Sequence, residues 1–480
     1  MMKRYLLPAL LAFLVLLGGC AMVGPDYEVP QQAAARRDDV GQDFANAGNP
    51  AFTSAPLPPR WWHLYHDATL DGLVEQALQA NTDLRAAAAN LARARALREE
   101  AEAAGHPAAG VSAAPAYGRP SAAAKGLPGP LSSSGSYDAG ISVSYQLDLF
   151  GKIARAVEAA GADADAAAAA YDLARVTVAA DTARAFADAC SARRQIAVAE
   201  KSLSLQGDVV RLTGERTQAG RGTALDVSRA RSQLEQLRAA VPPLQTQQRS
   251  ALYRLAVLTG RPPAALPASI AACDAAPHLT TPIPVGDGAA LLRRRPDIRQ
   301  AERALAGTVA RIGVATADLY PSISLGLSAG SSGALGQFGS AATYRWSLGP
   351  LISWSLPTRG VRSRIAQARA GSDAALARFD AAVLNALRET ETALTAYAQE
   401  LDRNAALRQA RDQSELAAQQ ARTLYRYGRT EFLTTLDADR TLASSESALA
   451  ASDAQLATNQ IALFLALGGG WEGEDGASAQ

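Results

Sequence analysis

The chain has 480 residues and carries 47 basic against 46 acidic side chains, so its formal net charge is +1. With no basic stripe and no acidic run, the sequence points to no nucleic-acid partner and to no solvating tail. Hydrophobic residues make up 48% of the chain and aromatic residues only 6%, and the abundance of alanine favours long, closely packed helices. Beyond the first 20 residues no apolar run reaches the ~20 residues of a spanning helix, so any membrane crossing would use strands.

The N-terminus has the pattern of a targeting signal. Lys3 and Arg4 precede an apolar run, Tyr5–Leu17, that is too short to span a bilayer. The run ends in Leu-Gly-Gly-Cys, which resembles the lipobox of bacterial lipoproteins; the alternative is an ordinary secretory signal with an unrelated cysteine. The lipobox predicts cleavage before Cys20 and its lipidation, and several acyl chains anchor a protein stably. Ala21 in place of an aspartate is typical of sorting to the outer membrane.

After this signal, helices alternate with pairs of strands. Hydrophobic period and breaker residues predict, in order, a helix over 70–104, strands over 108–118 and 137–149, a long helix over 153–219 and a returning helix over 223–260. A second series follows, with a helix over 288–318, strands over 321–330 and 343–356, a long helix over 361–427 and a returning helix over 431–467. A helix of some 65 residues extends roughly 100 Å, several times the width of a globular domain.

The two series are copies of one another. Residues of the first series match residues of the second in the same order, and the separation between matched residues is nearly constant. This predicts a tandem duplication. The matched pairs are Asp83 and Asp297, Arg85 and Arg299, Pro107 and Pro321, Gly151 and Gly360, Gly220 and Gly428, and Leu225 and Leu433.

The strands have two different faces. In "ISLGLSA" from Ile323, apolar side chains alternate with Ser and Gly, and the strands over 137–149 and 343–356 also alternate. This suits lipid on one side and water on the other, although a soluble sandwich with one solvated face shows a similar pattern. Four strands are too few to close a barrel, and open edges are not tolerated in lipid. The pattern therefore predicts an oligomer, and three copies would supply twelve strands.

Taken together, these features resemble those of the outer membrane factors of tripartite efflux systems, the TolC-like family, and most closely its OprM-type lipoproteins. The resemblance covers essentially the whole mature chain. The segments that carry it are the lipobox with "CAMVGPDYEVP" (20–30), "RWWHLYHDATLDGLVEQAL" (60–78), "LDLFGK" (147–152), "LLRRRPDIRQAER" (291–303), "LYPSISLG" (319–326) and the pair "GTALDVSRARS" and "FLTTLDADRTL". One departure is the second strand-to-helix junction, which reads "SLPTRG" where the first reads "LDLFGK".

The resemblance implies a fold that is mainly α with a β-barrel portion. Each chain would give four membrane strands to a 12-stranded barrel and its long helices to a periplasmic α-helical barrel, in a homotrimer. The implied regions are a signal peptide (1–19), a lipidated segment that wraps the equator (20–69), a first repeat (70–260), an equatorial linker (261–287), a second repeat (288–467) and a C-terminal tail (468–480).

The resemblance also implies a gate at the periplasmic end of the tunnel. By motif, the closing residues are Leu433, Asp437 and Arg440, with Leu225 and Asp226 in the equivalent part of the first half. Leu433 and Asp437 are four apart and share a helix face, and three aspartates around an axis form a ring of charge that filters ions. Asp437 and Arg440 are three apart and could pair; the alternative is an exposed pair that contributes little.

The turns beside this gate are expected to meet the adaptor. Gly220, Gly222 and Gly428 are expected to supply positive φ at helix ends, and Thr430 completes the second turn. The implied partners are a periplasmic adaptor protein, an inner-membrane pump of the RND type and the lipid of the outer membrane.

With Cys20 lipidated, Cys190 and Cys273 remain as thiols. In an oxidising compartment they could form a disulfide or stay as two buried thiols, and spacing does not decide. The equatorial placement implied by the resemblance brings Cys273 near the middle of the helix that contains Cys190, and this favours the disulfide.

No catalytic or cofactor motif stands out, and the covalent lipid on Cys20 is the only modification expected. His63, His66 and Asp67 lie close enough in sequence for a metal site, but a structural role is favoured. The sequence therefore predicts a passive exit duct for small molecules, such as drugs and toxic compounds, and no enzyme. Two alternatives are a type I protein secretion duct and a lipid-anchored trimeric coiled coil.

Overall fold

The computed structural model describes residues 22–119, 121–123, 126, 128–265, 270, 273, 275–279 and 281–471, so the lipobox and Cys20 lie outside the described residues. The chain divides into two compact units. The first comprises Met1–Pro30, Asn90–Ala168 and Gln300–Phe379, and the second comprises Gln31–Ala89, Ala169–Arg299 and Asp380–Gln480. Each unit therefore draws segments from both halves of the duplicated sequence.

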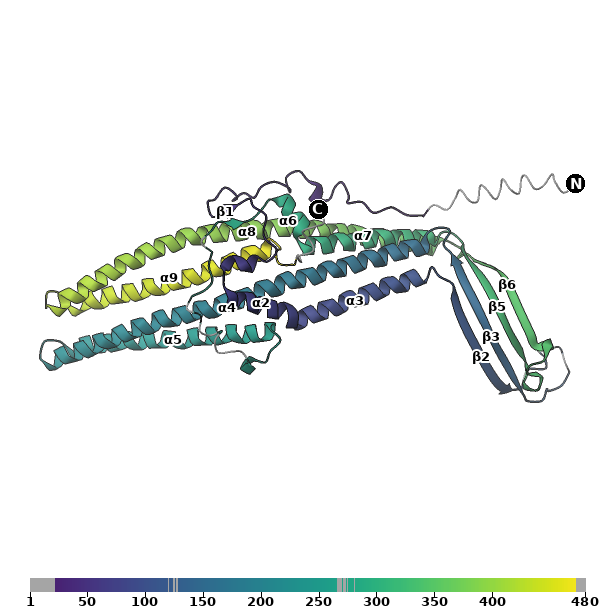
Figure 1. Ribbon diagram of the computed structural model, residues 1–480, viewed down its shortest axis with the longest axis horizontal. Helices are drawn as coiled ribbons and strands as arrows, with labels where there is room; N and C mark the ends of the chain where they lie inside the picture. The colour runs from purple at the N-terminus through teal and green to yellow at the C-terminus, as the bar shows by residue number, and fades with distance from the viewer. Residues whose placement is uncertain are drawn as a thin grey trace. The chain divides into compact units, whose positions relative to one another are not determined.

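Long helices make up most of the described chain (Figure 1). The helices are α2 (Ala68–Ala80), α3 (Thr82–Ala103), α4 (Lys152–Gln218), α5 (Ala224–Leu258), α6 (Gly288–Arg294), α7 (Pro296–Ala317), α8 (Arg359–Arg426) and α9 (Phe432–Ala466). The strands are β1 (Phe52–Thr53), β2 (Ala108–Gly118), β3 (Ser134–Leu147), β4 (Ile283–Pro284), β5 (Ser322–Ala334) and β6 (Tyr344–Ser353). The four long helices α4, α5, α8 and α9 agree with the sequence prediction to within two residues at each end.

The helices predicted over 70–104 and 288–318 are each broken, at equivalent points of the two halves. Asn81 separates α2 from α3; its side chain donates to the carbonyl of Leu258 at 3.1 Å and accepts from the amide of Asp83 at 2.8 Å. In the second half Arg295 is extended because Pro296 follows it and disfavours a helical conformation. The prediction of unbroken helices was wrong in the first half because the contacts that fix Asn81 come from a distant segment, and in the second half because Pro296 keeps Arg295 out of the helix.

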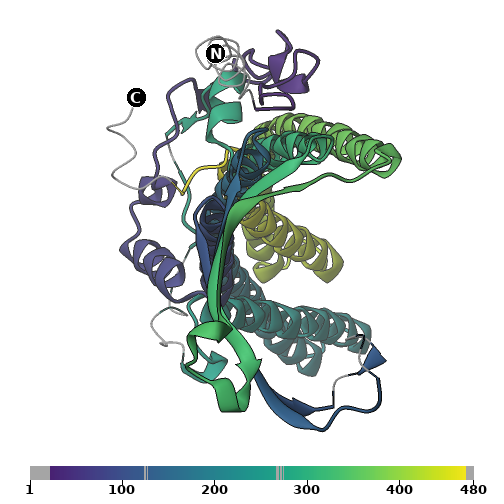
Figure 2. The same ribbon diagram turned by 90° about the vertical axis from the view of Figure 1, so that its right-hand side faces the viewer.

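Strands β2, β3, β5 and β6 form one antiparallel sheet in that order (Figure 1). Figure 2 shows that the sheet is curved. The predicted strand over 137–149 starts earlier, at Ser134, and ends at Leu147, because the Asp148 carboxylate accepts from the amides of Ile153 and Ala154 and starts α4. The strand over 343–356 ends at Ser353, where the Trp354 indole turns to donate to the carbonyl of Leu319.

The register of the sheet sorts its side chains onto two faces. Directly opposed residues point to the same side of a sheet, so each row across the strands belongs to one face. Two adjacent rows of the apolar face contain Val111, Ile141, Ala329 and Trp346, and Ala109, Val143, Leu327 and Leu348. The row between them belongs to the polar face and contains Gly110, Ser142, Ser328 and Ser347. The alternation predicted within each strand therefore continues across all four strands.

The second unit contains the main hydrophobic core. Trp61 is fully buried and stacks on Phe464 of α9, with ring centroids 4.5 Å apart. Trp62, Tyr65 and the first residues of α2 pack into the same cluster. The segment "RWWHLYHDATL" thus fastens the N-terminal part of this unit to its last helix. Over the described part of the chain, no helix has the length and apolar character needed to cross a membrane.

Candidate functional site

The helices α4 and α5, and likewise α8 and α9, form two long hairpins (Figure 1) that end in closely similar turns. Gly220 has φ +72° and Gly428 has φ +70°, so both adopt the left-handed conformation that favours glycine at a helix end. The next residue in each turn donates its amide back to the helix, from Arg221 to Arg216 and from Arg429 to Leu424, each at 2.8 Å. The duplication therefore extends to the local geometry of the turns.

Gly222 differs from the expectation that all three glycines supply positive φ. Its φ is not positive, and an added Cβ would lie 2.8 Å from the Thr217 hydroxyl oxygen. Glycine is needed there for close approach and not for a left-handed backbone, so this part of the prediction was wrong.

The helices that leave the two turns begin differently. Thr223 caps α5 in a reciprocal arrangement: its hydroxyl accepts from the amide of Asp226, whose carboxylate accepts from the Thr223 amide. The residue before α9, Glu431, makes no side-chain cap, and Phe432 instead packs on Tyr425 with centroids 5.9 Å apart. Thr430, in the turn before α9, is half-buried. The Asp226 carboxylate is therefore engaged in a helix cap.

Leu433 and Asp437 are both exposed on one face of α9, and the Leu433 side chain is 49% exposed. Leu225 is exposed in the same way at the start of α5. Arg440, one turn beyond Asp437, does not pair with it in the described chain; its Nε donates to Gln233 Oε1 of α5 at 2.8 Å. The carboxylate of Asp437 is therefore left facing outward, and the basic side chain links the two hairpins.

Further contacts between the hairpins were not predicted from the sequence. Arg216 of α4 donates to the carbonyl of Tyr425 at 3.0 Å, and its guanidinium lies 4.2 Å from the centre of the Tyr425 ring. Lys201 pairs with Glu446 of α9 at 3.0 Å. Nothing in the local sequence signals these pairs, because their members are more than two hundred residues apart. Together with the Arg440 contact they join the α4–α5 hairpin to the α8–α9 hairpin at three levels.

Asp439 lies beside these contacts and is 9% exposed. Arg422 donates to its Oδ1 at 2.8 Å, while Oδ2 is buried with no hydrogen-bond partner among the described residues. Burial raises the pKa of Asp439 and outweighs the opposing effect of Arg422. A cavity of about 20 Å³ next to the carboxylate has room for one water molecule.

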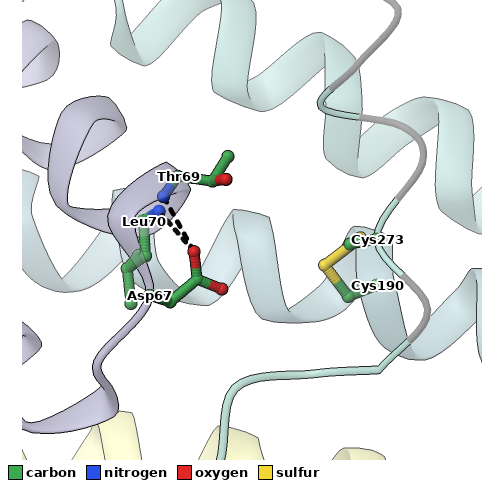
Figure 3. The surroundings of a disulfide bond; sticks show 5 residues. All are labelled: Asp67, Thr69, Leu70, Cys190 and Cys273. Carbon is green, nitrogen blue, oxygen red and sulfur yellow. Dashed lines mark hydrogen bonds between the residues drawn. A yellow bond between two sulfur atoms is a disulfide. The ribbon is translucent and has the colours of Figure 1, made fainter.

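A disulfide joins Cys190 of α4 to Cys273, with the two Cα atoms 5.3 Å apart (Figure 3). Cys190 is fully buried in the core of the second unit. Nearby, the Asp67 carboxylate caps α2 by accepting from the amides of Thr69 and Leu70, which gives this residue a structural role. In the described segments no three His, Cys, Asp or Glu side chains are grouped to hold a metal ion.

We expect Cys273→Ala to loosen the segment around residues 261–282. The disulfide closes a loop between residues 83 apart in sequence, for which chain entropy predicts a stabilisation of about 4.5 kcal/mol. Limited proteolysis should cut this segment faster in the variant, and wild type treated with reductant should match it. Equal cleavage rates in oxidised wild type and variant would contradict a structural role for the bond.

In the first unit, Arg155 of α4 holds the N-terminal segment in place. Its side chain is 2% exposed and donates to the carbonyls of Val23 and Gly24 and to the Asp26 carboxylate, the last at 2.6 Å. It also pairs with Glu158 at 2.6 Å. The Arg155 guanidinium donates to backbone carbonyls as well as to a carboxylate. It therefore fixes the backbone of the N-terminal segment and not only a charged side chain.

Glycines make this docking close. Gly24 has φ +95°, and a Cβ there would lie 2.4 Å from the Cα of Gly313 in α7. Gly151 has φ +73°, and a Cβ there would lie 2.5 Å from the Met22 side chain. Residues 22–26 are thus seated between the end of the β3 strand and α7.

Arg155→Met should release the N-terminal segment while keeping an apolar stem of similar length. The lost charge-assisted hydrogen bonds amount to about 2 kcal/mol, or roughly a 30-fold rise in the detached fraction. Protease cleavage within 22–30 measures that fraction. Arg238→Met is the matched control, because Arg238 forms an exposed pair with Glu235 on α5; equal cleavage in both variants would count against the docking role.

Comparison with known proteins identifies relatives along nearly the whole chain. The model of the family described as "Outer membrane efflux protein" matches residues 73–261 and 289–469. Nodulation protein T of Rhizobium leguminosarum bv. trifolii is 30% identical over 96% of both chains. The toluene efflux pump outer membrane protein TtgC of Pseudomonas putida is 29% identical over 100% of this chain and 98% of its own length.

Solved structures of outer membrane proteins are also similar to this chain over most of its length. The outer-membrane channel OprN has a TM-score of 0.86 and 37% identity, covering 94% of this chain and 100% of its own. The outer membrane protein VceC of Vibrio cholerae has a TM-score of 0.79 and 27% identity, covering 87% of this chain and 100% of its own. These relatives are outer membrane proteins by name, and OprN is a channel.

Proposed function

Since the chain belongs to the outer membrane efflux protein family, we propose that it forms the outer membrane channel of a tripartite efflux system. It acts as a passive exit duct for small molecules, which an inner-membrane pump of the RND type delivers through a periplasmic adaptor. The names of relatives at 29% identity, which include toluene and antibiotic efflux, support small molecules as the cargo. The chain does no catalysis of its own.

The observation that carries this proposal is the two-faced sheet. Its apolar face suits lipid, and its face of Ser and Gly suits a water-filled lumen. The outer edges of β2 and β6 pair with no other strand of the described chain, and unpaired backbone groups are costly in lipid. Three copies joined edge to edge satisfy those groups, which supports a homotrimeric barrel of twelve strands.

Two further features fit this function. The exposed Leu433 and Asp437 at the hairpin ends form the periplasmic gate when three copies meet at one axis, and the neighbouring turns dock the adaptor. At the N-terminus, lipid on Cys20 anchors the protein in the outer membrane. In support of the anchor, Met22, two residues after Cys20, packs against Gly151, where a strand of the sheet turns into helix α4.

A pair of adjacent substitutions tests the orientation of the sheet. Ile141→Lys places a charge on the apolar face, where it costs about 2–4 kcal/mol in lipid, and should prevent insertion. Ser142→Lys places the same charge on the polar face and should leave an inserted trimer whose ion selectivity shifts toward anions.

The measurement is single-channel conductance in a planar bilayer, with the trimer verified by cross-linking. Wild type should give discrete conductance steps, Ile141→Lys none, and Ser142→Lys steps with altered selectivity. Absence of conductance from wild-type protein that is trimeric and inserted would contradict the channel.

A further inference from the structure

The connection between β5 and β6 folds onto one side of the sheet (Figure 2). It contains two short 3-10 turns, η7 (Leu335–Gln337) and η8 (Ala341–Thr343). We call residues 335–343 the outer loop, because they lie at the ends of the strands remote from the helices.

Three contacts place the outer loop on the apolar face. The Leu335 side chain occupies the space in front of Gly135, where an added Cβ would lie 2.2 Å from its Cδ1. The Phe338 ring packs on the Tyr137 ring with centroids 5.0 Å apart. Thr343 lies against Gly333, which is directly opposite Tyr137 in the register. Residues 135 and 137 share the side of β3 that carries Ile141, so the loop covers the apolar face and not the lumen.

The polar groups beneath the outer loop bond to one another. The Tyr137 hydroxyl lies 2.8 Å from Ser331 Oγ and donates to Thr343 Oγ1 at 3.0 Å. The Ser331 and Thr343 hydroxyls are 2.7 Å apart, and Thr343 Oγ1 also donates to the carbonyl of Ser340 at 2.7 Å. No residue of the loop is charged. A segment built this way can sit at the edge of lipid without leaving a buried polar group unpaired.

The outer surface of the loop is apolar and exposed. Phe338 is 74% exposed and Leu335 is 53% exposed. Tyr344 and Tyr117 flank them and are also exposed, so the patch continues directly into the apolar face of the sheet. Aromatic side chains at the boundary of an apolar band are characteristic of the membrane interface.

A second group of exposed aromatic residues marks the other boundary of the band. Trp354, Tyr320 and Tyr145 lie near the helix-proximal ends of the strands. Tyr344 and Trp354 are ten residues apart, or about 33 Å along a strand. At the usual tilt of about 40° this becomes roughly 25 Å, the height of a lipid-facing band.

We propose that the outer loop is a lipid-binding foot that lies in the outer leaflet, where head groups meet acyl chains, with Phe338 and Leu335 inserted among the lipids. This rests on the proposed function, since it takes the apolar face to be the lipid-facing one. Continuity with that face, the absence of charge and the internally bonded hydroxyls favour lipid over a protein ligand or a lid over the lumen.

The test uses nitroxide labels on single cysteines, Phe338→Cys, Leu348→Cys and Ser328→Cys, in trimers reconstituted into liposomes. Cys190 and Cys273 are bonded to each other, so each variant offers one labelling site among the described residues. Collision rates with oxygen and with a water-soluble nickel chelate distinguish lipid from water. The label at 338 should resemble the one at 348, with nickel access at least about threefold lower than at 328 and a shallower depth than at 348.

Nickel access at 338 equal to that at 328, with 348 still in lipid, would overturn the foot and leave the channel proposal intact. Water-like behaviour at 348 would instead overturn the channel proposal, and the foot with it. A label at 338 that is shielded from both reagents would show that protein covers the loop, and would also overturn the proposal. As a functional check, Phe338→Asp should lower the yield of inserted trimer and Phe338→Trp should not.

Discussion

Channels with Asp437→Ala are expected to conduct at least about threefold more current than wild type, because the proposed gate would lose the ring of three carboxylates that narrows the pore. Leu433→Ala should act in the same direction, since Leu433 shares the face of α9 that carries Asp437 and is 49% exposed in the single chain. Single-channel conductance in a planar bilayer measures both effects, and Asp437→Ala should also reduce the preference for cations.

Asp402→Ala is the matched control, because it removes an exposed carboxylate from α8 about seven helical turns before the hairpin end. Its conductance should equal that of wild type. An equal rise in both variants would mean that net charge, and not a gate at Asp437, sets the current. An unchanged Asp437→Ala channel would place the constriction elsewhere.

The second large effect is expected from the contacts that join the two hairpins. Arg216→Ala removes a hydrogen bond to the Tyr425 carbonyl and a cation–π contact, together about 2 kcal/mol. Arg440→Ala removes the bond to Gln233. If both contacts restrain the same motion of the α8–α9 hairpin, their effects should not be additive. The time that the double variant spends in a high-conductance state should then increase by more than the sum of the increases in the two single variants.

Arg211→Ala provides the control for this series. Arg211 is on the same helix as Arg216, but it pairs with Asp208 and Glu215, which belong to α4 itself. It should leave conductance unchanged. Additive single effects in the double variant would show that Arg216 and Arg440 act independently, and the idea of one shared motion would then fail.

The features that were predictable from sequence depend on short-range patterns. The hairpin ends at Gly220 and Gly428 follow from glycine at a helix end, and the faces of β3 and β5 follow from strict alternation. The duplication strengthened both predictions, since each element occurs twice. The family resemblance added the residues of the proposed gate, which no pattern in the chain marks by itself.

The features that were missed depend on contacts between distant segments. The helix break at Asn81 is fixed by a bond to Leu258, and Arg440 is held by Gln233, so neither neighbour is visible in the local sequence. The outer loop lies almost wholly between two predicted strands, and no pattern in its sequence predicted where it would pack. Its position on the apolar face depends on Tyr137, Phe338 and Leu335 packing in three dimensions.

The docking of the N-terminal segment has a consequence for the order of assembly. The residues that contact this segment include Arg155 from the first half of the duplicated chain and Gly313 from the second. Neither half alone supplies all of these contacts, so we expect residues 22–26 to reach their final position only after the two halves have associated. The part of the chain that is synthesised early would then be among the last to dock.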